Sequence, residues 1–249
     1  MTDHDDTPHR LAAARFSRHL LTGPAGTLEA ALQLPPQDAA MRGGAVVAHP
    51  HPLYGGTMQN AVVRHCADAC WRRGLTTLRF NFRGVGRSAG AHDEGRGEVG
   101  DLIAAHRWLV GEGTVEETEV PAAARSPVLW AGYSFGAAVA LAAALEAEAR
   151  PGPDALLLLA PPLAVRDLGF AATLDLPLAM IVGDLDELTP ADQVARARDW
   201  PGMRHCVALA NAGHDLGTAA PQPLVAALSE CLESLLEGSP ASPSRTSSD

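Results

Sequence analysis

The sequence contains no lysine, so all 19 of its basic residues are arginine. This absence excludes a Walker-type phosphate loop and Schiff-base catalysis, because both require a lysine amine. No apolar run approaches the roughly 20 residues of a membrane-spanning helix, and the N-terminus lacks the apolar core of a secretory signal. The formal net charge of −10 argues against nucleic acid as a partner, because binding phosphates requires clustered positive charge. We therefore expect a cytoplasmic protein, either a monomer or a homodimer.

The sequence also lacks the cysteine and histidine motifs that are typical of metal sites. The four cysteines (Cys66, Cys70, Cys206 and Cys231) include no C-x-x-C pair, which favours free thiols in a reducing compartment. His49 and His51 alternate, so both side chains could face one side, but zinc needs at least a third ligand and no partner motif is present. We expect neither a metal nor another cofactor.

The composition is typical of a globular domain, with 47% apolar and 19% charged residues in a chain of 249. This length is sufficient for one domain with a full core. Residues 1–14 are polar and charged, and residues 238–249 are rich in proline and serine, so we expect both ends to be disordered. The folded domain is expected over residues 15–237.

Short apolar runs alternate with longer helical segments along this domain. The pattern predicts strands over residues 45–48, 75–82, 128–131, 155–160, 178–182 and 206–210, and helices over 58–73, 98–110, 135–149, 191–199 and 224–236. Residues 15–21 and 27–34 flank a Gly-Pro-Ala-Gly turn and predict an antiparallel hairpin at one edge. The order predicts an α/β fold, with a mostly parallel, doubly wound sheet and helices on both faces. Ligands bind such sheets beyond the carboxyl ends of the strands.

The segment Gly132-Tyr133-Ser134-Phe135-Gly136 has the form G-x-S-x-G, between a predicted strand and a predicted helix. In this context the serine lies at the apex of a tight turn, where the two glycines leave room for it. The start of the helix supplies free N–H groups and a positive dipole end. We therefore predict that Ser134 is a nucleophile, in preference to a serine that only caps the helix.

A nucleophilic serine needs a base, which in turn needs a carboxylate to orient it. Two histidines follow Ser134. His205 precedes the last predicted strand and would emerge at the wrong edge of the sheet, whereas His214 follows that strand in a glycine-containing loop. His214 is therefore the predicted base. Two carboxylates, Asp184 and Asp186, follow the preceding strand and are both candidates for the acid.

In these motifs the chain resembles the α/β-hydrolase superfamily, over roughly residues 16–236. The segment HPHPLYGGTMQN, at residues 49–60, is similar to that of a subgroup of small bacterial hydrolases. The resemblance implies the chain order Ser, acid, His, and a G-x-x-D pattern that favours Asp186 over Asp184. It also implies an oxyanion hole made by the N–H of Phe135 and an N–H from the loop after strand 45–48. In that loop Pro50 and Pro52 have no N–H, which leaves His51, Leu53 or Tyr54, of which we favour Leu53.

The segment Gly84-Val85-Gly86-Arg87-Ser88-Ala89 matches the pattern G-x-G-x-x-A, which is found in dinucleotide-binding proteins. It does not open a helix directly and does not belong to the first strand–helix unit, so dinucleotide binding is rejected. A glycine turn that carries Arg83 near the site is preferred. Arg83 could bind an anionic group of the substrate or tie loops together.

Members of this superfamily often insert a cap before the strand that bears the acid, but here the interval 161–177 is too short for a cap domain. A shallow pocket follows from this length. Its expected lining residues are His51, Tyr54, Tyr133, Leu163 and Phe170, with Arg83 nearby.

These features together predict a serine hydrolase that cleaves small carboxylic esters through an acyl-enzyme. The same residues could serve a thioesterase or an acyltransferase. A third hypothesis is a non-catalytic protein of this fold that only binds a ligand.

Overall fold

A computed structural model describes residues 15–36, 39–112, 120–146 and 152–237 of the chain. The termini expected to be disordered, 1–14 and 238–249, lie outside the described residues. No helix in the described ranges combines the length and hydropathy needed to cross a membrane.

Eight strands form one sheet in the described part of the chain, in the order β1-β2-β4-β3-β5-β6-β7-β8. β1 and β2 form the antiparallel hairpin at one edge, β2 also runs antiparallel to β4, and the remaining neighbours are parallel. The strands are β1 (Arg15–Gly23), β2 (Gly26–Leu34), β3 (Gly43–Ala48), β4 (Leu75–Phe80), β5 (Val128–Tyr133), β6 (Ala155–Leu159), β7 (Leu178–Gly183) and β8 (Met203–Leu209).

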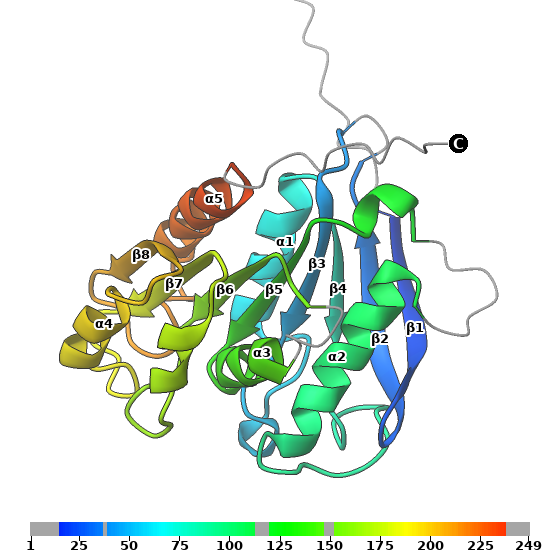
Figure 1. Ribbon diagram of the computed structural model, residues 1–249, viewed down its shortest axis with the longest axis horizontal. Helices are drawn as coiled ribbons and strands as arrows, with labels where there is room; N and C mark the ends of the chain where they lie inside the picture. The colour runs from blue at the N-terminus through cyan, green and yellow to red at the C-terminus, as the bar shows by residue number, and fades with distance from the viewer. Residues whose placement is uncertain (1–14, 37–38, 113–119, 147–151, 238–249) are drawn as a thin grey trace, which may run out of the picture.

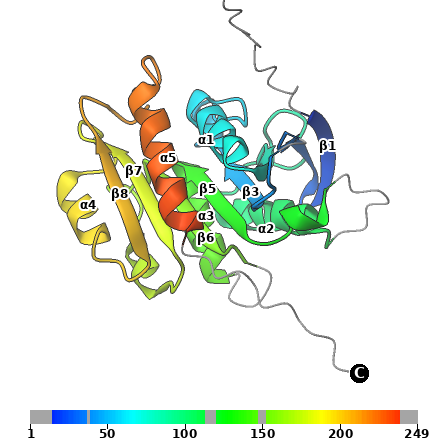
Figure 2. The same cartoon turned by 90° about the horizontal axis from the view of Figure 1, so that it is seen from above.

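Helices cover both faces of this sheet, as the two views in Figures 1 and 2 show. One face packs against α2, α3 and α4, and the other packs against α1 and α5. The helices are α1 (Ala61–Arg72), α2 (Arg96–Val110), α3 (Phe135–Glu146), α4 (Ala191–Ala197) and α5 (Gln222–Leu236). Because both faces are covered, every residue of β3, β4, β5, β6 and β7 is buried.

The fold class predicted from the sequence is confirmed, including the N-terminal hairpin and the lack of a substantial cap. Each predicted strand and helix is present, and most boundaries differ by a few residues. The predicted helix 135–149 is α3, whose described part ends at Glu146. The interval between β6 and β7 holds only a short 3₁₀ turn, Gly169–Thr173.

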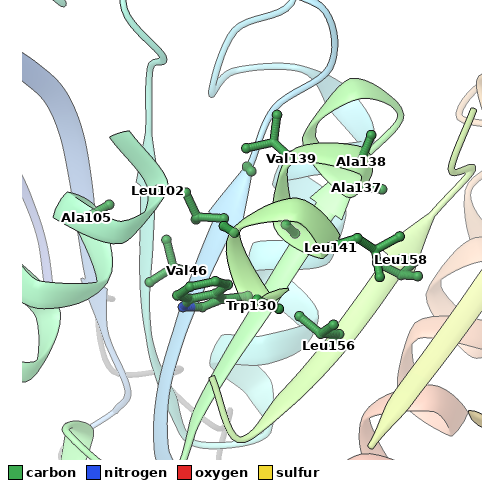
Figure 3. Packing of buried hydrophobic residues seen from close by; sticks show 14 of the residues in the cluster. Val46, Leu102, Ala105, Trp130, Ala137, Ala138, Val139, Leu141, Leu156 and Leu158 are labelled. Carbon is green, nitrogen blue, oxygen red and sulfur yellow. The ribbon is translucent and has the colours of Figure 1, made fainter. Parts of the chain in front are cut away.

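The larger hydrophobic cluster lies between the sheet and the α2–α3 face, and Trp130 of β5 is completely buried in it. Figure 3 shows Trp130 in this cluster with Leu102 of α2 and Leu141 of α3. The indole N–H of Trp130 donates to Nδ1 of His106 at 2.9 Å. Burial lowers the pKa of His106 from 6.5 to about 4, so this ring stays neutral at physiological pH. The core thus fixes β5, the strand that leads into Ser134.

Candidate active site

The turn at Ser134 connects β5 directly to α3. Ser134 has a φ of 55°, a left-handed conformation that costs energy for a residue with a side chain. A Cβ built on Gly132 would collide with the carbonyl oxygen of Gly136, and one built on Gly136 would lie 2.6 Å from the carbonyl oxygen of His49. The two glycines of the motif are therefore required for the close approach of backbone segments on either side of the serine.

The side chains of Ser134, His214 and Asp186 form a hydrogen-bonded chain, with His214 between the other two. His214 Nε2 is 2.8 Å from Ser134 Oγ, and His214 Nδ1 is 2.9 Å from Asp186 Oδ2. Ser134 follows β5, Asp186 follows β7 and His214 follows β8, so all three are at the carboxyl edge of the sheet. This arrangement can pass a proton from the hydroxyl to the imidazole while the carboxylate holds the ring in one tautomer.

The carboxylate of Asp186 is held by other groups besides His214. Its Oδ1 accepts the N–H of Leu188 at 2.9 Å, and its Oδ2 lies 2.8 Å from the hydroxyl of Thr189. Burial alone would raise the pKa of Asp186, but the hydrogen bonds from His214 and Thr189 lower it below its usual value. The other sequence candidate, Asp184, accepts the N–H of Ala212 at 3.2 Å, so it braces the loop that carries His214.

Tyr133 also supports the loop of His214. Its hydroxyl donates to the carbonyl oxygen of His214 at 2.9 Å, and the two ring centroids are 5.6 Å apart. Burial raises the pKa of Tyr133 to about 12, so the phenol keeps the proton that this hydrogen bond needs. Tyr133 therefore positions the backbone on which the imidazole is mounted.

The N–H groups near Ser134 differ in whether they are free. Among the described residues, neither the N–H of Phe135 nor that of His51 has an acceptor. The N–H of Leu53 donates to His51 Nδ1 at 3.2 Å, and that of Tyr54 donates to the His51 carbonyl at 3.1 Å. The preference for Leu53 as the second oxyanion donor is therefore wrong, because its N–H donates to the side chain of His51, which caps the 3₁₀ turn Pro52–Tyr54.

His51 lies directly beside the serine turn. Its ring centroid is 4.9 Å from that of Phe135 and 4.8 Å from that of His92. Burial, followed by the electrostatic effects of the neighbouring His92 and Arg166, lowers the pKa of His51. The neutral ring can accept the Leu53 N–H through Nδ1, which leaves the proton on Nε2.

His49 has a structural role. Its Nδ1 donates to the carbonyl oxygen of Pro50 at 2.7 Å, and its Nε2 accepts the N–H of Phe82 at 3.0 Å. The side chain is completely buried, and this burial lowers its pKa from 6.5 to about 4. Both ring nitrogens are engaged, so His49 ties the loop after β3 to the loop after β4. No group of three or more potential metal ligands is close enough to hold an ion in the described part of the chain.

The two buried neutral histidines predict a stability that depends on pH. When the chain unfolds, His49 and His106 regain pKa values near 6.5 and bind protons that the folded state excludes below this pH. The free energy of unfolding should therefore fall as the pH drops from about 6.5 to about 4, by roughly 1.4 kcal/mol per pH unit for each ring. Urea unfolding at several pH values measures this slope. His106→Gln, whose side-chain oxygen can still accept from Trp130, should lower this slope by the contribution of one ring, roughly 1.4 kcal/mol per pH unit. An unchanged slope would contradict the lowered pKa of His106.

A cavity of about 270 Å³ opens beside Ser134. Three of the residues predicted to line the pocket, His51, Tyr54 and Tyr133, border this cavity. The other lining residues are Pro50, Ser134, Phe135, Pro162, Val165, Arg166, Leu188 and His214. The sequence did not indicate Val165 and Arg166, because a short irregular segment has no periodicity to show which side chains face the site.

Three residues predicted to lie at the pocket are elsewhere. Leu163 is buried in the hydrophobic cluster of the α2–α3 face, and Phe170 packs against that cluster and lines a neighbouring hollow. Arg83 forms an ion pair with Asp101 at 2.8 Å and donates to the carbonyl oxygen of Gly97. Of the two roles open to Arg83, the structure favours tying loops together.

Comparisons with known proteins agree with this fold. No family model matches the chain. A solved α/β serine hydrolase without a lid from Xanthomonas campestris is 31% identical, with a TM-score of 0.75 over 91% of this chain and 97% of that one. An α/β serine hydrolase homologue from Coxiella burnetii is also 31% identical, with a TM-score of 0.72 over 86% of this chain and 96% of that one. The chain belongs to the α/β-hydrolase superfamily.

Two further proteins are similar to the chain. A putative α/β hydrolase from Agrobacterium tumefaciens is 30% identical over 89% of this chain and 97% of that one, with a TM-score of 0.75. An uncharacterized protein of Rickettsia prowazekii is 39% identical over 153 residues. That match covers 60% of this chain and 59% of the length of the curated relative.

Proposed function

We propose that the protein is a serine hydrolase of small carboxylic esters. Ser134 is the nucleophile, His214 is the general base and acid, and Asp186 orients the imidazole. The observation that carries the proposal is the position of the His214 ring, with one nitrogen 2.8 Å from the serine oxygen and the other 2.9 Å from the carboxylate. These are the distances at which a histidine can activate a serine hydroxyl.

The reaction proceeds in two halves. Ser134 Oγ attacks the ester carbonyl while His214 Nε2 takes the hydroxyl proton, and a tetrahedral oxyanion forms. The intermediate collapses, the bond to the alcohol oxygen breaks, and His214 returns the proton to this leaving group. Water then attacks the acyl-serine with His214 as the base, and the acid is released together with the free serine. Asp186 stays ionised throughout and stabilises the imidazolium, in keeping with its lowered pKa.

The oxyanion is stabilised by the N–H groups of Phe135 and His51. Both are free of acceptors among the described residues, and the loop that carries His51 contacts the serine turn at Gly136. The N–H of Phe135 is in the first turn of α3, where the helix dipole adds positive potential. Donors of this kind are typically worth about 2.7–4 kcal/mol of transition-state stabilisation each.

The size of the cavity supports small acyl groups. A volume of about 270 Å³ is slightly below the roughly 300–1,000 Å³ that is typical of ligand sites. Tyr54, which lines the cavity, is highly exposed, and the segment between β6 and β7 contributes Pro162, Val165 and Arg166 to the wall. A long acyl chain would extend past these residues into water.

A series of p-nitrophenyl esters from acetate to dodecanoate tests the substrate class. We expect kcat/KM to be highest for acyl chains of two to about six carbons and to fall by about tenfold or more by twelve. Steady-state release of p-nitrophenol measures this. A preference for the longest chains would contradict the shallow pocket, and release of only one equivalent of product followed by arrest would indicate a ligand-binding protein.

A further inference from the structure

The cavity beside Ser134 contains one permanently charged side chain. Among the described residues that line it, Phe135, Pro162, Val165 and Leu188 provide apolar surface, no carboxylate is present, and Arg166 carries the one permanent charge. Pockets of this kind bind a ligand through apolar contact and orient it through a few polar groups. Arg166 is therefore the residue with which a charged part of a ligand would pair.

Two contacts fix the guanidinium of Arg166. Its NH1 donates to the carbonyl oxygen of Glu94 at 3.2 Å, and its Cζ lies over the ring of Phe135, 5.4 Å from the centroid. Phe135 is the residue after Ser134, so the stacked cation is held close to the position where a substrate must bind. The contribution of Arg166 to the lowered pKa of His51 indicates the same proximity.

This guanidinium has no carboxylate partner. Within the described part of the chain, no carboxylate oxygen lies within 4.0 Å of it. Glu94 and Asp167 line a neighbouring hollow of about 260 Å³ that Arg166 also borders, but neither forms an ion pair with it. By contrast, Arg83 is paired with Asp101. Because a guanidinium has five N–H donors, Arg166 retains donors for a ligand.

We propose that Arg166 selects esters that carry a carboxylate, in the acyl part or in the alcohol part, and binds this carboxylate while Ser134 attacks the ester. A planar guanidinium pairs with a carboxylate through two parallel hydrogen bonds, which gives both strength and orientation. The protein as a whole has a net charge of −10, so a local cation is needed to hold an anionic substrate. This inference rests on the proposed esterase function and adds the class of substrate.

The experiment compares matched esters in the full-length protein and in Arg166→Gln. Monoethyl glutarate is compared with ethyl pentanoate, in which a methyl group replaces the carboxylate, and 4-acetoxybutanoate is compared with butyl acetate. For at least one pair, Arg166→Gln should lower the ratio of kcat/KM for the charged ester over the neutral ester by about 10- to 100-fold. Arg166→Lys keeps the charge without the planar fork and should restore part of the ratio.

Arg96→Gln is the matched control. Arg96 borders the neighbouring hollow but not the cavity beside Ser134, and its largely exposed guanidinium pairs with Asp93. This variant removes the same charge from the adjacent surface, so it tests whether a long-range field could produce the effect. The ratio should change by less than about twofold, because exposed charges are screened by salt.

The outcomes separate this inference from the proposed function. If the wild-type protein hydrolyses the neutral esters but Arg166→Gln leaves both ratios unchanged, the role of Arg166 is overturned and the esterase proposal stands. Equal losses for charged and neutral esters would likewise overturn selection by charge. If no ester is hydrolysed, the esterase proposal fails. Calorimetric titration then tests whether Arg166 binds the carboxylate: monoethyl glutarate is titrated into Ser134→Ala and into the double variant Ser134→Ala, Arg166→Gln. Binding that is weaker by a similar factor in the double variant supports the proposal, and equal binding overturns it.

Discussion

Ser134→Ala should reduce kcat for p-nitrophenyl butyrate by at least about 10⁴-fold, because it removes the hydroxyl that His214 contacts and that forms the acyl-enzyme. Alanine keeps the Cβ that already occupies the left-handed turn, so the fold should persist. Initial rates at saturating ester measure the loss, and circular dichroism checks the fold.

Ser234→Ala is the matched control for this substitution. Ser234 lies in the last turns of α5, beside Leu235 and Leu236, which line a hollow together with Gly44 and Asp154. Since Gly44 is near the start of β3 and Asp154 precedes β6, this end of α5 is at the amino edge of the sheet, opposite Ser134. Its variant should retain the full rate. A Ser134→Ala protein that also retained most of its activity would exclude Ser134 as the nucleophile.

Asp186→Asn is expected to lower kcat by about 10³- to 10⁴-fold, while KM changes much less. The carboxylate accepts a hydrogen bond from His214 Nδ1 at 2.9 Å. An amide can instead donate to Nδ1, which moves the ring proton to Nε2 and leaves no lone pair to accept the proton of Ser134. The rate at saturating substrate, compared with that of the wild type, measures the effect of the wrong tautomer.

Asp184→Asn distinguishes the two carboxylates that follow β7. Asp184 accepts the N–H of Ala212, a bond that an asparagine oxygen can also accept, and it does not contact the imidazole. We expect less than about a threefold change in kcat for this variant. If instead Asp184→Asn caused the larger loss, the assignment of Asp186 as the acid would be overturned.

The fold could be predicted from the sequence because its signals are local. Buried strands such as β6 and β7 are continuous apolar runs, and the glycines around Ser134 mark a strand-to-helix turn that few other residues allow. The choice of His214 over His205 followed from chain order alone, because the carboxyl ends of parallel strands meet at one edge. Asp186 could be preferred over Asp184 only through the resemblance to a family, because both follow the same strand.

The parts of the site that were mispredicted depend on side-chain contacts that the pattern of the sequence does not show. Leu53 lost its predicted role because the side chain of His51 accepts its N–H, a local cap that composition does not reveal. Leu163 and Phe170 have the same apolar character as true lining residues, and only packing decides which ones face the cavity. Arg83 and Arg166 differ in whether a carboxylate reaches them, and Asp101 is 18 residues away from Arg83.

Labelling with a fluorophosphonate tests most directly whether Ser134 is a nucleophile activated by His214. The reagent captures a serine whose hydroxyl proton is removed by a neighbouring base, and it does not depend on the natural substrate. We predict one covalent adduct on Ser134 in the wild-type protein, located by mass spectrometry of its peptides, and loss of nearly all labelling in His214→Ala. An adduct on a different residue, or labelling of Ser134 at an undiminished rate without His214, would contradict the proposed activation of this serine.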